Sequence, residues 1–266
     1  MKDNIIHKKY LKYAYYRLLG FFNFLIELAR PSKITDYKEI PIIINNFNRL
    51  DCVKKLIYSL EKRGYTNIYI IDNLSTYPPL LEFYEKCEYP VFRLDRNLGK
   101  NALWLSRIYK KFRKDFFVYS DSDVVPIEEC PDDFLLLFLN ILKKHRFAQK
   151  VGFSLKIDDL PDCYSMKEDV VTYEQYFYKY KVSDLLYYAP IDTTFALYRP
   201  RAKRRHANYN IEMYRTAYPY MARHLPWYID SENPDEESIF FLKQKLVGTA
   251  WSKKLKEELT GNHSIS

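Results

Sequence analysis

Between residues 39 and 126, short apolar runs alternate with helical patterns, and this alternation constrains the fold more than any other feature of the sequence. Four runs have the length and the β-branched or aromatic character of buried strands. They cover residues 40–44, 67–71, 90–94 and 116–119. Helical patterns follow the first three runs: one ends at Gly64, one covers 78–87, and one covers 101–112 with Asn101 as its cap. Because strands that alternate with helices form parallel sheets with right-handed crossovers, the sequence predicts an α/β domain with a mixed, mostly parallel central sheet flanked by helices.

Polar residues follow each of the four predicted strands. Asn46, Asp72 and Asn97 come after the first three strands, and Asp121 and Asp123 come after the fourth. The carboxyl ends of parallel strands meet at one edge of a sheet, and ligands bind there at the point where the strand order reverses. We therefore expect these five side chains on one rim of the sheet.

Asp121 and Asp123 form an Asp-x-Asp sequence directly after a buried strand. On an extended backbone, residues i and i+2 point the same way, so the two carboxylates are expected about 7 Å apart at the backbone. Magnesium often takes one or two carboxylates together with substrate phosphates. The pair therefore suits a divalent cation that bridges to a diphosphate, and the alternative is a polar turn after a strand. The glycine-rich motifs of dinucleotide-binding and P-loop proteins are missing from the sequence.

Composition narrows the class of partner and the compartment. The chain has 266 residues, of which 47% are apolar, enough for one large α/β domain or two small ones. A net charge of +8 and a pI of about 9.0 favour anionic partners such as nucleic acid, anionic lipid or a phosphorylated small molecule. The four cysteines have neither zinc-ligand nor redox-motif spacing, and no signal-peptide cleavage site is visible. We expect a cytoplasmic setting, with peripheral binding to the inner face of the cell membrane as a further option.

Residues 8–30 carry a helical pattern with an apolar and a polar face. At about 100° per residue, the apolar face comprises Leu11, Ala14, Tyr15, Leu18, Phe22, Leu25 and Ala29. The opposite face comprises Lys9, Lys12, Tyr16, Gly20, Asn23, Glu27 and Arg30. The apolar run is too short and too interrupted for a membrane span. Its wide aromatic face with basic flanks suits a helix in a membrane interface, and the alternative is a helix packed on the catalytic domain or on a partner subunit.

Three motifs together resemble the family-2-type glycosyltransferases of the GT-A fold. Residues 42–49, with the sequence Ile-Ile-Ile-Asn-Asn-Phe-Asn-Arg, resemble their first strand and loop. Residues 70–75, Ile-Ile-Asp-Asn-Leu-Ser, resemble their nucleoside loop, and residues 121–123 resemble their metal motif. The resemblance covers residues 39–126. The chain departs from the pattern at Asn46, where a Thr or Ala after Pro is common, and it lacks the Gln-x-x-Arg-Trp motif of processive synthases.

This resemblance implies a nucleotide-diphosphate sugar as donor, with Mn²⁺ or Mg²⁺ on its diphosphate. It implies Asp121 and Asp123 as metal ligands and Asp72 as the residue that faces the base or the ribose. We assign further polar residues of these loops to donor binding: Asn46, Asn48, Arg49, Asn73, Asn97, Lys100 and Ser122. The implied reaction moves the sugar, with inversion, to a hydroxyl of a glycan or lipid-linked saccharide, as in bacterial surface polysaccharide synthesis.

The second half of the chain supplies candidates for the remaining roles. In inverting GT-A enzymes a carboxylate after the metal strand takes the proton of the acceptor hydroxyl, and we assign this general base to Asp192. The alternatives are Asp158, Asp159 and the acidic cluster 235–237. His224 is the candidate for a further metal ligand, because imidazole is an acceptable one; the alternative is a structural histidine.

Two divisions of the chain follow from this interpretation. We expect an N-terminal helix and linker over residues 1–35 and a GT-A domain over 36–266, with a nucleotide-binding half over 36–126 and an acceptor-binding half over 127–266.

Two other functions stay open. A metal-dependent nucleotidyltransferase on a similar fold usually has a glycine-rich loop after the first strand, and residues 45–49 contain no glycine. A nucleic-acid-binding protein would interleave aromatic and basic residues. Here the basic residues are spread, or clustered at the N-terminal helix and at residues 201–205.

Overall fold

The computed structural model describes residues 2–191, 195–202 and 211–244; within the first helix it describes side chains from residue 14 on, except those of residues 16 and 19. The helices are α1 (Lys2–Ala29), α2 (Leu50–Lys62), α3 (Pro78–Lys86), α4 (Ala102–Leu105), α5 (Tyr109–Phe112), α6 (Phe134–Lys144), α7 (Lys167–Gln175) and α8 (Glu236–Lys243). The strands are β1 (Ile42–Asn46), β2 (Ile68–Asp72), β3 (Val91–Arg93), β4 (Phe117–Asp121), β5 (Val124–Pro126), β6 (Lys150–Leu155), β7 (Lys181–Ser183), β8 (Leu186–Tyr188), β9 (Ala196–Tyr198) and β10 (Met213–His224).

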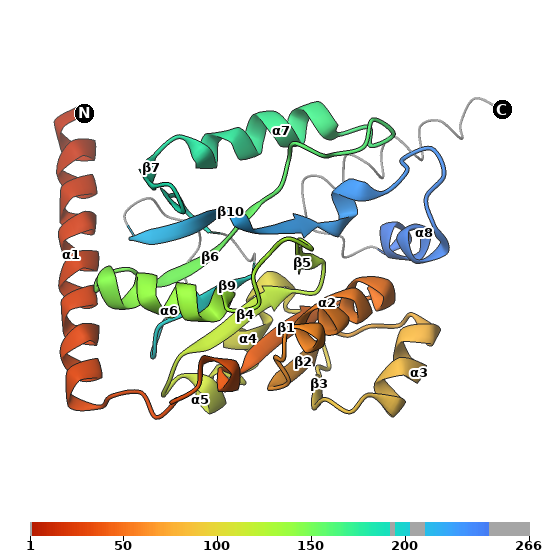
Figure 1. The fold of residues 1–266 in the computed structure, drawn as a ribbon, viewed down its shortest axis with the longest axis horizontal. Helices are drawn as coiled ribbons and strands as arrows, with labels where there is room; N and C mark the ends of the chain where they lie inside the picture. Colours follow the sequence, from red (N-terminus) through yellow and green to blue (C-terminus); the bar gives the residue numbers. More distant parts are fainter. Residues whose placement is uncertain (1, 192–194, 203–210, 245–266) are drawn as a thin grey trace.

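The strands of the described residues join into one sheet in the order β3-β2-β1-β4-β9-β6-β10-β8-β7, and β5 pairs with β10 (Figure 1). Strands β3, β2, β1 and β4 pair in parallel, and so do β6 and β10. Strand β9 lies antiparallel between β4 and β6, so β4, β6 and β10 still point the same way. The expected fold class, a mixed and mostly parallel sheet flanked by helices, is confirmed. It is the architecture that the resemblance to GT-A enzymes implied.

The core lies on both faces of this sheet because consecutive strand residues point to opposite faces. Ile42 and Ile44 of β1 belong to the larger apolar cluster, which includes residues of α2, α3 and α6. Ile43, between them, belongs to a second cluster that includes residues of α4 and α5. All three isoleucines are fully buried. The uninterrupted apolar run of β1 therefore reflects a strand covered on both sides, as expected for a central parallel strand.

The expected helix over residues 101–112 is wrong as a single element. It is split into α4 and α5 by Arg107, whose φ of 67° is left-handed. A left-handed residue cannot continue a right-handed helix, so the break falls there. The predicted cap also differs, since the Asn101 side chain makes no capping hydrogen bond.

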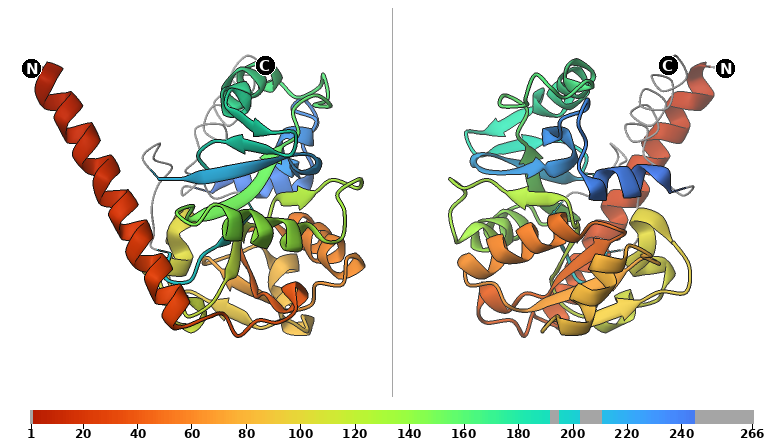
Figure 2. Two further views of the ribbon diagram at one scale, coloured as in Figure 1. Left: turned by 60° about the vertical axis from the view of Figure 1, so that its left-hand side comes forward. Right: turned by 90° about the vertical axis from the view of Figure 1, so that its right-hand side faces the viewer.

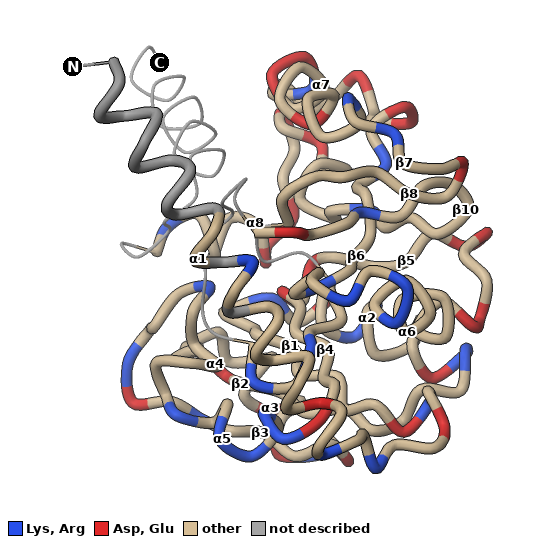
Figure 3. Tube along the Cα trace, turned by 90° about the vertical axis from the view of Figure 1, so that its left-hand side faces the viewer, with Lys and Arg blue, Asp and Glu red and all other residues tan. Residues whose placement is uncertain are grey.

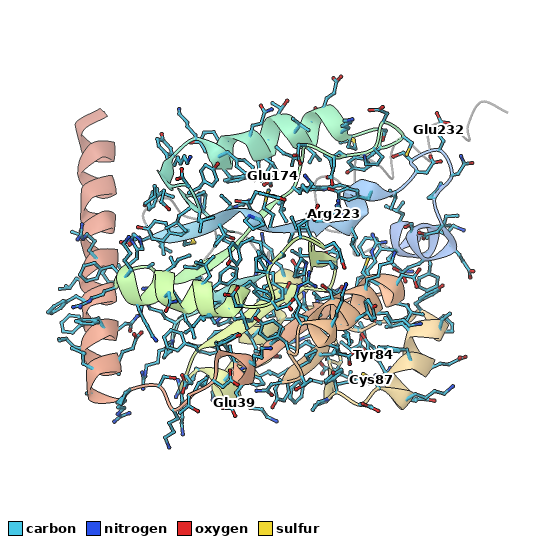
Figure 4. All side chains as sticks on the ribbon, viewed as in Figure 1. Glu39, Tyr84, Cys87, Glu174, Arg223 and Glu232 are labelled. Carbon is cyan, nitrogen blue, oxygen red and sulfur yellow. The ribbon has the colours of Figure 1, made fainter. Side chains whose placement is uncertain are left out.

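Helix α7 is fixed to the outer strands by a buried ion pair. Nη1 of Arg215, on β10, lies 2.8 Å from Oε2 of Glu174, on α7, and both side chains are buried. Figure 4 labels Glu174. Arg215 also donates to the backbone oxygen of Pro190 at 2.9 Å and lies 4.0 Å from the centre of the Phe177 ring. Burial of both charges is tolerated because each is paired and hydrogen-bonded.

Helix α1 stands beside the sheet as a long rod, with its N-terminal part away from the body of the molecule (Figure 2). Glu27 and Gly20 contact the body, as described below, and so do Arg17, 5.2 Å from the centre of the Phe147 ring, and Phe24, whose ring centre lies 5.1 Å from the Arg146 guanidinium. Among the residues that the structure describes, no helix is both long enough and apolar enough to cross a bilayer. The division of the chain at residues 35 and 126 stays a prediction.

Close packing at Gly152 of β6 gives a first testable prediction. A Cβ atom there would lie 2.5 Å from the backbone oxygen of Phe195 and 2.9 Å from Cβ of Ala196. The Gly152→Ala variant should therefore lose about 1–3 kcal/mol of unfolding free energy, because β9 must shift to make room. Urea denaturation measures this loss.

Gly20→Ala is the matched control, since its added Cβ would come no closer than 3.4 Å to Phe147. A Gly152→Ala protein as stable as the wild type would contradict the described packing of β6 on β9.

Candidate functional site

The strand order reverses at β1, which has β2 on one side and β4 on the other. The register aligns Asn46 with Asp72 across one pair and Asn45 with Asp121 across the other. Nδ2 of Asn45 donates to Oδ1 of Asp121 at 3.2 Å. The polar ends of three neighbouring strands therefore meet at the reversal, where open α/β sheets bind their ligands.

The strands themselves include residues that the sequence pattern had placed in loops. Strand β1 ends at Asn46 and β4 ends at Asp121, so both polar positions take part in the parallel ladder. Asn45, a residue that was not among the candidates, is the one that contacts Asp121. Its position after three isoleucines in the same run was the available signal.

His224 reaches the same place from the far end of the chain. Strand β5, which follows Asp123 directly, pairs antiparallel with the end of β10 and sets His224 opposite Val124. The backbone N–H of Leu225 donates to the backbone oxygen of Asp123 at 2.8 Å. As a result, Nε2 of His224 lies 3.6 Å from Oδ2 of Asp123. Burial lowers the pKa of His224, opposed by the nearby Asp123 carboxylate, so the imidazole is neutral at pH 7 and can act as a ligand.

Several polar atoms at this edge are buried without a hydrogen-bond partner among the described residues. They are Oδ1 of Asp123, Nδ1 of His224, Oδ1 of Asn45, Oδ1 of Asn46 and Nε of Arg49. Buried polar groups in folded proteins are normally paired, and exceptions mark groups that await a ligand, a water or an ion. Their concentration around the strand-order reversal is typical of a binding site.

These residues fit a hard divalent cation that is completed by a phosphate-bearing ligand. Carboxylates and imidazole are acceptable donors for Mg²⁺ or Mn²⁺. Within the described part of the chain, no three His, Cys, Asp or Glu side chains gather into a group that would hold a metal alone. Asp121, Asp123 and His224 would therefore share the ion with oxygens of the bound substrate, as is usual for magnesium sites.

On the other side of β1, the predicted nucleoside loop is ordered by its own side chains. Oδ1 of Asp72 accepts from the backbone N–H of Ser75 at 3.1 Å, and Oδ2 lies 3.5 Å from Nε of Arg93. Nδ2 of Asn46 donates to the hydroxyl of Tyr84, on α3, at 2.8 Å. Tyr84 was not predicted, because nothing in the sequence indicates that α3 folds back onto β1.

Two of the predicted donor-binding asparagines hold loops together. Oδ1 of Asn48 accepts from the backbone N–H groups of Thr76 and Tyr77, at 2.7 and 2.9 Å. Asn73 accepts from the backbone N–H of Leu98 at 2.7 Å and donates to the backbone oxygen of Gly99 at 3.1 Å. The contribution of Asn48 and Asn73 to donor binding stays a prediction. In the structure, their side chains hold the loops that form the rim.

The other predicted donor-binding residues differ in exposure. Asn97 accepts from the backbone N–H of Gly99 at 2.8 Å, and Lys100 is exposed nearby. Ser122 is buried, and its backbone N–H donates to the backbone oxygen of Asn45 at 3.0 Å. Asn97, Lys100 and Ser122 therefore stay predictions as donor ligands.

Arg49 is held at the rim by helix α8. Its guanidinium lies 3.8 Å from the centre of the Phe241 ring, and Nη1 donates to Oγ of Ser238 at 3.4 Å. Oε2 of Glu237 accepts from the backbone N–H of Asp51 at 2.8 Å, which ties α8 to the start of α2. These contacts join residues almost 190 positions apart, a distance over which sequence patterns carry no signal.

Asp192, the predicted general base, lies outside the described residues. Of its alternatives, Asp158 is exposed and paired with Lys156 at 2.6 Å. Burial raises the pKa of Asp159, but hydrogen bonds from Tyr228 and Arg223, each 2.5 Å long, outweigh burial and lower it overall.

Two members of the acidic cluster 235–237 also have structural partners. Asp235 caps α8 by accepting from the backbone N–H of Ser238 at 2.7 Å. Glu237 accepts from α2, as described above, and burial raises its pKa. Of the described alternatives to Asp192, Asp158, Asp159, Asp235 and Glu237 are therefore engaged with partners, and Glu236 is exposed.

Comparisons with known proteins find only structures of low similarity to this chain. The sequence matches no protein-family model, and no curated protein matches it significantly. Among solved structures, it is similar to residues 1–349 of TarS from S. aureus, with 14% identity and a TM-score of 0.43, over 85% of this chain and 72% of that one.

Two longer chains are similar as well. A longer TarS chain has 12% identity and a TM-score of 0.44, and this chain spans 84% of its own length but 43% of that one. GalNAc-T7, solved with UDP, GalNAc and Mn²⁺, has 13% identity and a TM-score of 0.43, over 84% of this chain and 54% of the other.

The lowered pKa of His224 gives a prediction for stability. Below about pH 6.5, an unfolded histidine takes up a proton that buried His224 resists. The unfolded state then binds more protons, so the unfolding free energy should fall as the pH drops below 6.5. In metal-free buffer, urea denaturation at pH 7.5 and 5.5 should show a larger loss for the wild type than for His224→Asn. Equal losses in the two proteins would contradict a neutral, buried His224.

Proposed function

We propose that this protein is a glycosyltransferase that moves a sugar from a nucleotide-diphosphate donor to a hydroxyl of a glycan or lipid-linked saccharide. The observation that carries the proposal is the approach of His224 to Asp123, beside Asp121, at the strand-order reversal. The resemblance of residues 39–126 to family-2-type enzymes supports the donor class and an acceptor in bacterial surface polysaccharide synthesis.

In this proposal, Asp121 and Asp123 hold Mn²⁺ or Mg²⁺ together with the donor diphosphate, and His224 is a further ligand. Such an ion, when bound, offsets the negative charge of the leaving diphosphate. Arg49 adds a buried positive charge at the N-cap of α2, where helix geometry also favours anions. The rim thus combines cationic groups for the diphosphate with Asp72 for the nucleoside.

Asp192 takes the acceptor proton in the proposed reaction. The acceptor oxygen then attacks the anomeric carbon, and the bond from that carbon to the diphosphate oxygen breaks with its electron pair going to the diphosphate. Attack from the face opposite the leaving group inverts the anomeric centre. This step requires a carboxylate on the acceptor side of the sugar, across from Asp121 and Asp123.

Metal-dependent binding of the donor is the direct test. A thermal-shift panel of nucleotide diphosphates and nucleotide sugars, with and without Mn²⁺, should reveal a ligand that raises the melting temperature only with metal. At a hundredfold excess over Kd, the expected stabilisation is about 2.7 kcal/mol, or about 5–10 °C for a chain of this size. Asp121→Asn and Asp123→Asn should abolish this shift and the transfer of sugar.

Asp184→Asn is the control, because that carboxylate is almost fully exposed and pairs with Lys181 at the surface. Metal-independent binding, or wild-type transfer by either variant, would eliminate the proposed metal site. Transfer of a nucleotidyl group in place of a sugar would favour the nucleotidyltransferase alternative.

The general base has its own test. Asp192→Asn keeps the side-chain volume and removes its basicity, so turnover should fall about 10²–10⁴-fold with donor affinity nearly unchanged. Steady-state kinetics and the thermal shift measure the two quantities separately. Turnover near the wild-type rate would move the assignment to Asp158, Asp159 or the cluster 235–237.

A further inference from the structure

Helix α1 contacts the rest of the molecule through its polar face. Oε2 of Glu27 pairs with Nη1 of Arg199 at 2.7 Å, and both side chains are largely buried. Arg199 is fixed in turn by backbone oxygens of the body, including that of Ala148 at 2.6 Å. About two helical turns towards the N-terminus from Glu27, Gly20 is buried against Phe147. A buried ion pair and a close glycine contact therefore set the rotation of α1 about its own axis.

The apolar face of α1 consequently points away from the protein. Its described large apolar members, with their exposed fractions, are Tyr15 56%, Leu18 56%, Phe21 44%, Phe22 52%, Leu25 42%, Ile26 37% and Leu28 64%. At about 100° per residue, they span an arc of about 160° whose middle lies opposite Gly20 and Glu27. Among the described residues, Figure 2 shows the helices and strands of the body on one side of the rod.

This orientation is the reverse of what a packed surface helix adopts. Helices on globular proteins turn their apolar stripe to the core and their polar residues to water. Here the polar stripe has a specific buried partner in Arg199, while the apolar stripe is left outside. Contiguous exposed apolar surface of this kind marks an interaction site.

The charges around the apolar arc favour an anionic partner. Arg17 and Arg30 are exposed on its two margins, and the Arg17 guanidinium also lies 5.2 Å from the centre of the Phe147 ring of the body. Residues 1–30 contain six Lys or Arg and two acids, and one of the acids, Glu27, already pairs with Arg199. A second copy of the helix would thus meet like charge with almost no acid to balance it, whereas anionic headgroups would complement the margins.

Basic residues continue from α1 onto the neighbouring part of the body. Oγ of Ser32 and the backbone N–H of Lys33 donate to the Asp115 carboxylate, which ties the linker after α1 to the segment that follows α5. Helix α5 carries Lys110 and Lys111 in its last turn. Figure 3, viewed from the α1 side, shows Lys and Arg around α5.

We propose that α1 is the docking element for an anionic lipid bilayer, lying in the headgroup region with the arc from Tyr15 to Leu28 inserted. Aromatic and leucine side chains supply the inserted surface, and the arginines at the margins contact lipid phosphates. The width of the arc exceeds the narrow two-position seam of a coiled coil, which also favours a lipid surface over a second helix. This inference is independent of the proposed transfer reaction.

Co-sedimentation of the full chain with vesicles tests the proposal. The protein should bind phosphatidylcholine vesicles that contain roughly one third phosphatidylglycerol, bind pure phosphatidylcholine far less, and lose binding as salt rises. The double variant Leu18→Glu/Leu25→Glu should lower the bound fraction at least tenfold, and Arg30→Gln should weaken binding about fivefold. All three substituted positions are exposed, so circular dichroism and the melting temperature should stay at wild-type values.

The matched control is Tyr180→Glu/Val182→Glu, which places the same charges on exposed apolar positions beside β7. It should bind vesicles like the wild type. Equal binding to both vesicle types, or wild-type binding by Leu18→Glu/Leu25→Glu, would overturn the proposal. So would a wild-type dimer in solution that Leu18→Glu/Leu25→Glu converts to monomers, because the arc would then be a contact between two copies.

Discussion

Parallel pairing of β1 with β4 is the interaction on which the candidate site depends. It makes β1 the point where the strand order reverses, and it sets Asn45 beside Asp121 in register. The isoleucines of β1 are fully buried on both faces of the sheet. A shift of the register by one residue would move every side chain of the strand to the opposite face, so the packing holds the register. The same apolar packing that fixes the core therefore fixes where the polar strand ends lie.

A second constraint brings the two halves of the chain together at that point. Strand β10 pairs along its length with β6 and β8, and its last residues pair with β5, which follows Asp123. Because Arg215, near the start of β10, is held by Glu174 and Pro190, the strand is anchored well before it reaches His224. The neutral imidazole next to Asp123 is thus placed by a strand ladder, a more rigid support than a loop.

Polar residues at the rim have two different roles. Asn48, Asn73, Asp235 and Glu237 use their side chains on backbone groups of neighbouring loops and helix starts. Atoms of Asp123, His224, Asn45 and Arg49 are buried and unpaired among the described residues. The first set shapes the rim, and the second set has hydrogen-bonding or ligating atoms that are free to bind a ligand there. Substitution in the first set should therefore change the shape of the rim, and substitution in the second set should change ligand binding.

The sequence by itself determined the order of strands and helices over residues 39–126, the parallel sheet, and the position of Asp121 and Asp123 at its edge. These features follow from local periodicity and from the geometry of parallel strands, which act over a few residues. Only the tertiary structure decided that His224 lies beside Asp123, that Arg49 stacks on Phe241, and that α1 turns its polar face inward. Each of these depends on a contact between distant segments, such as Glu27 with Arg199, and the helical pattern of residues 8–30 is the same whichever face is covered.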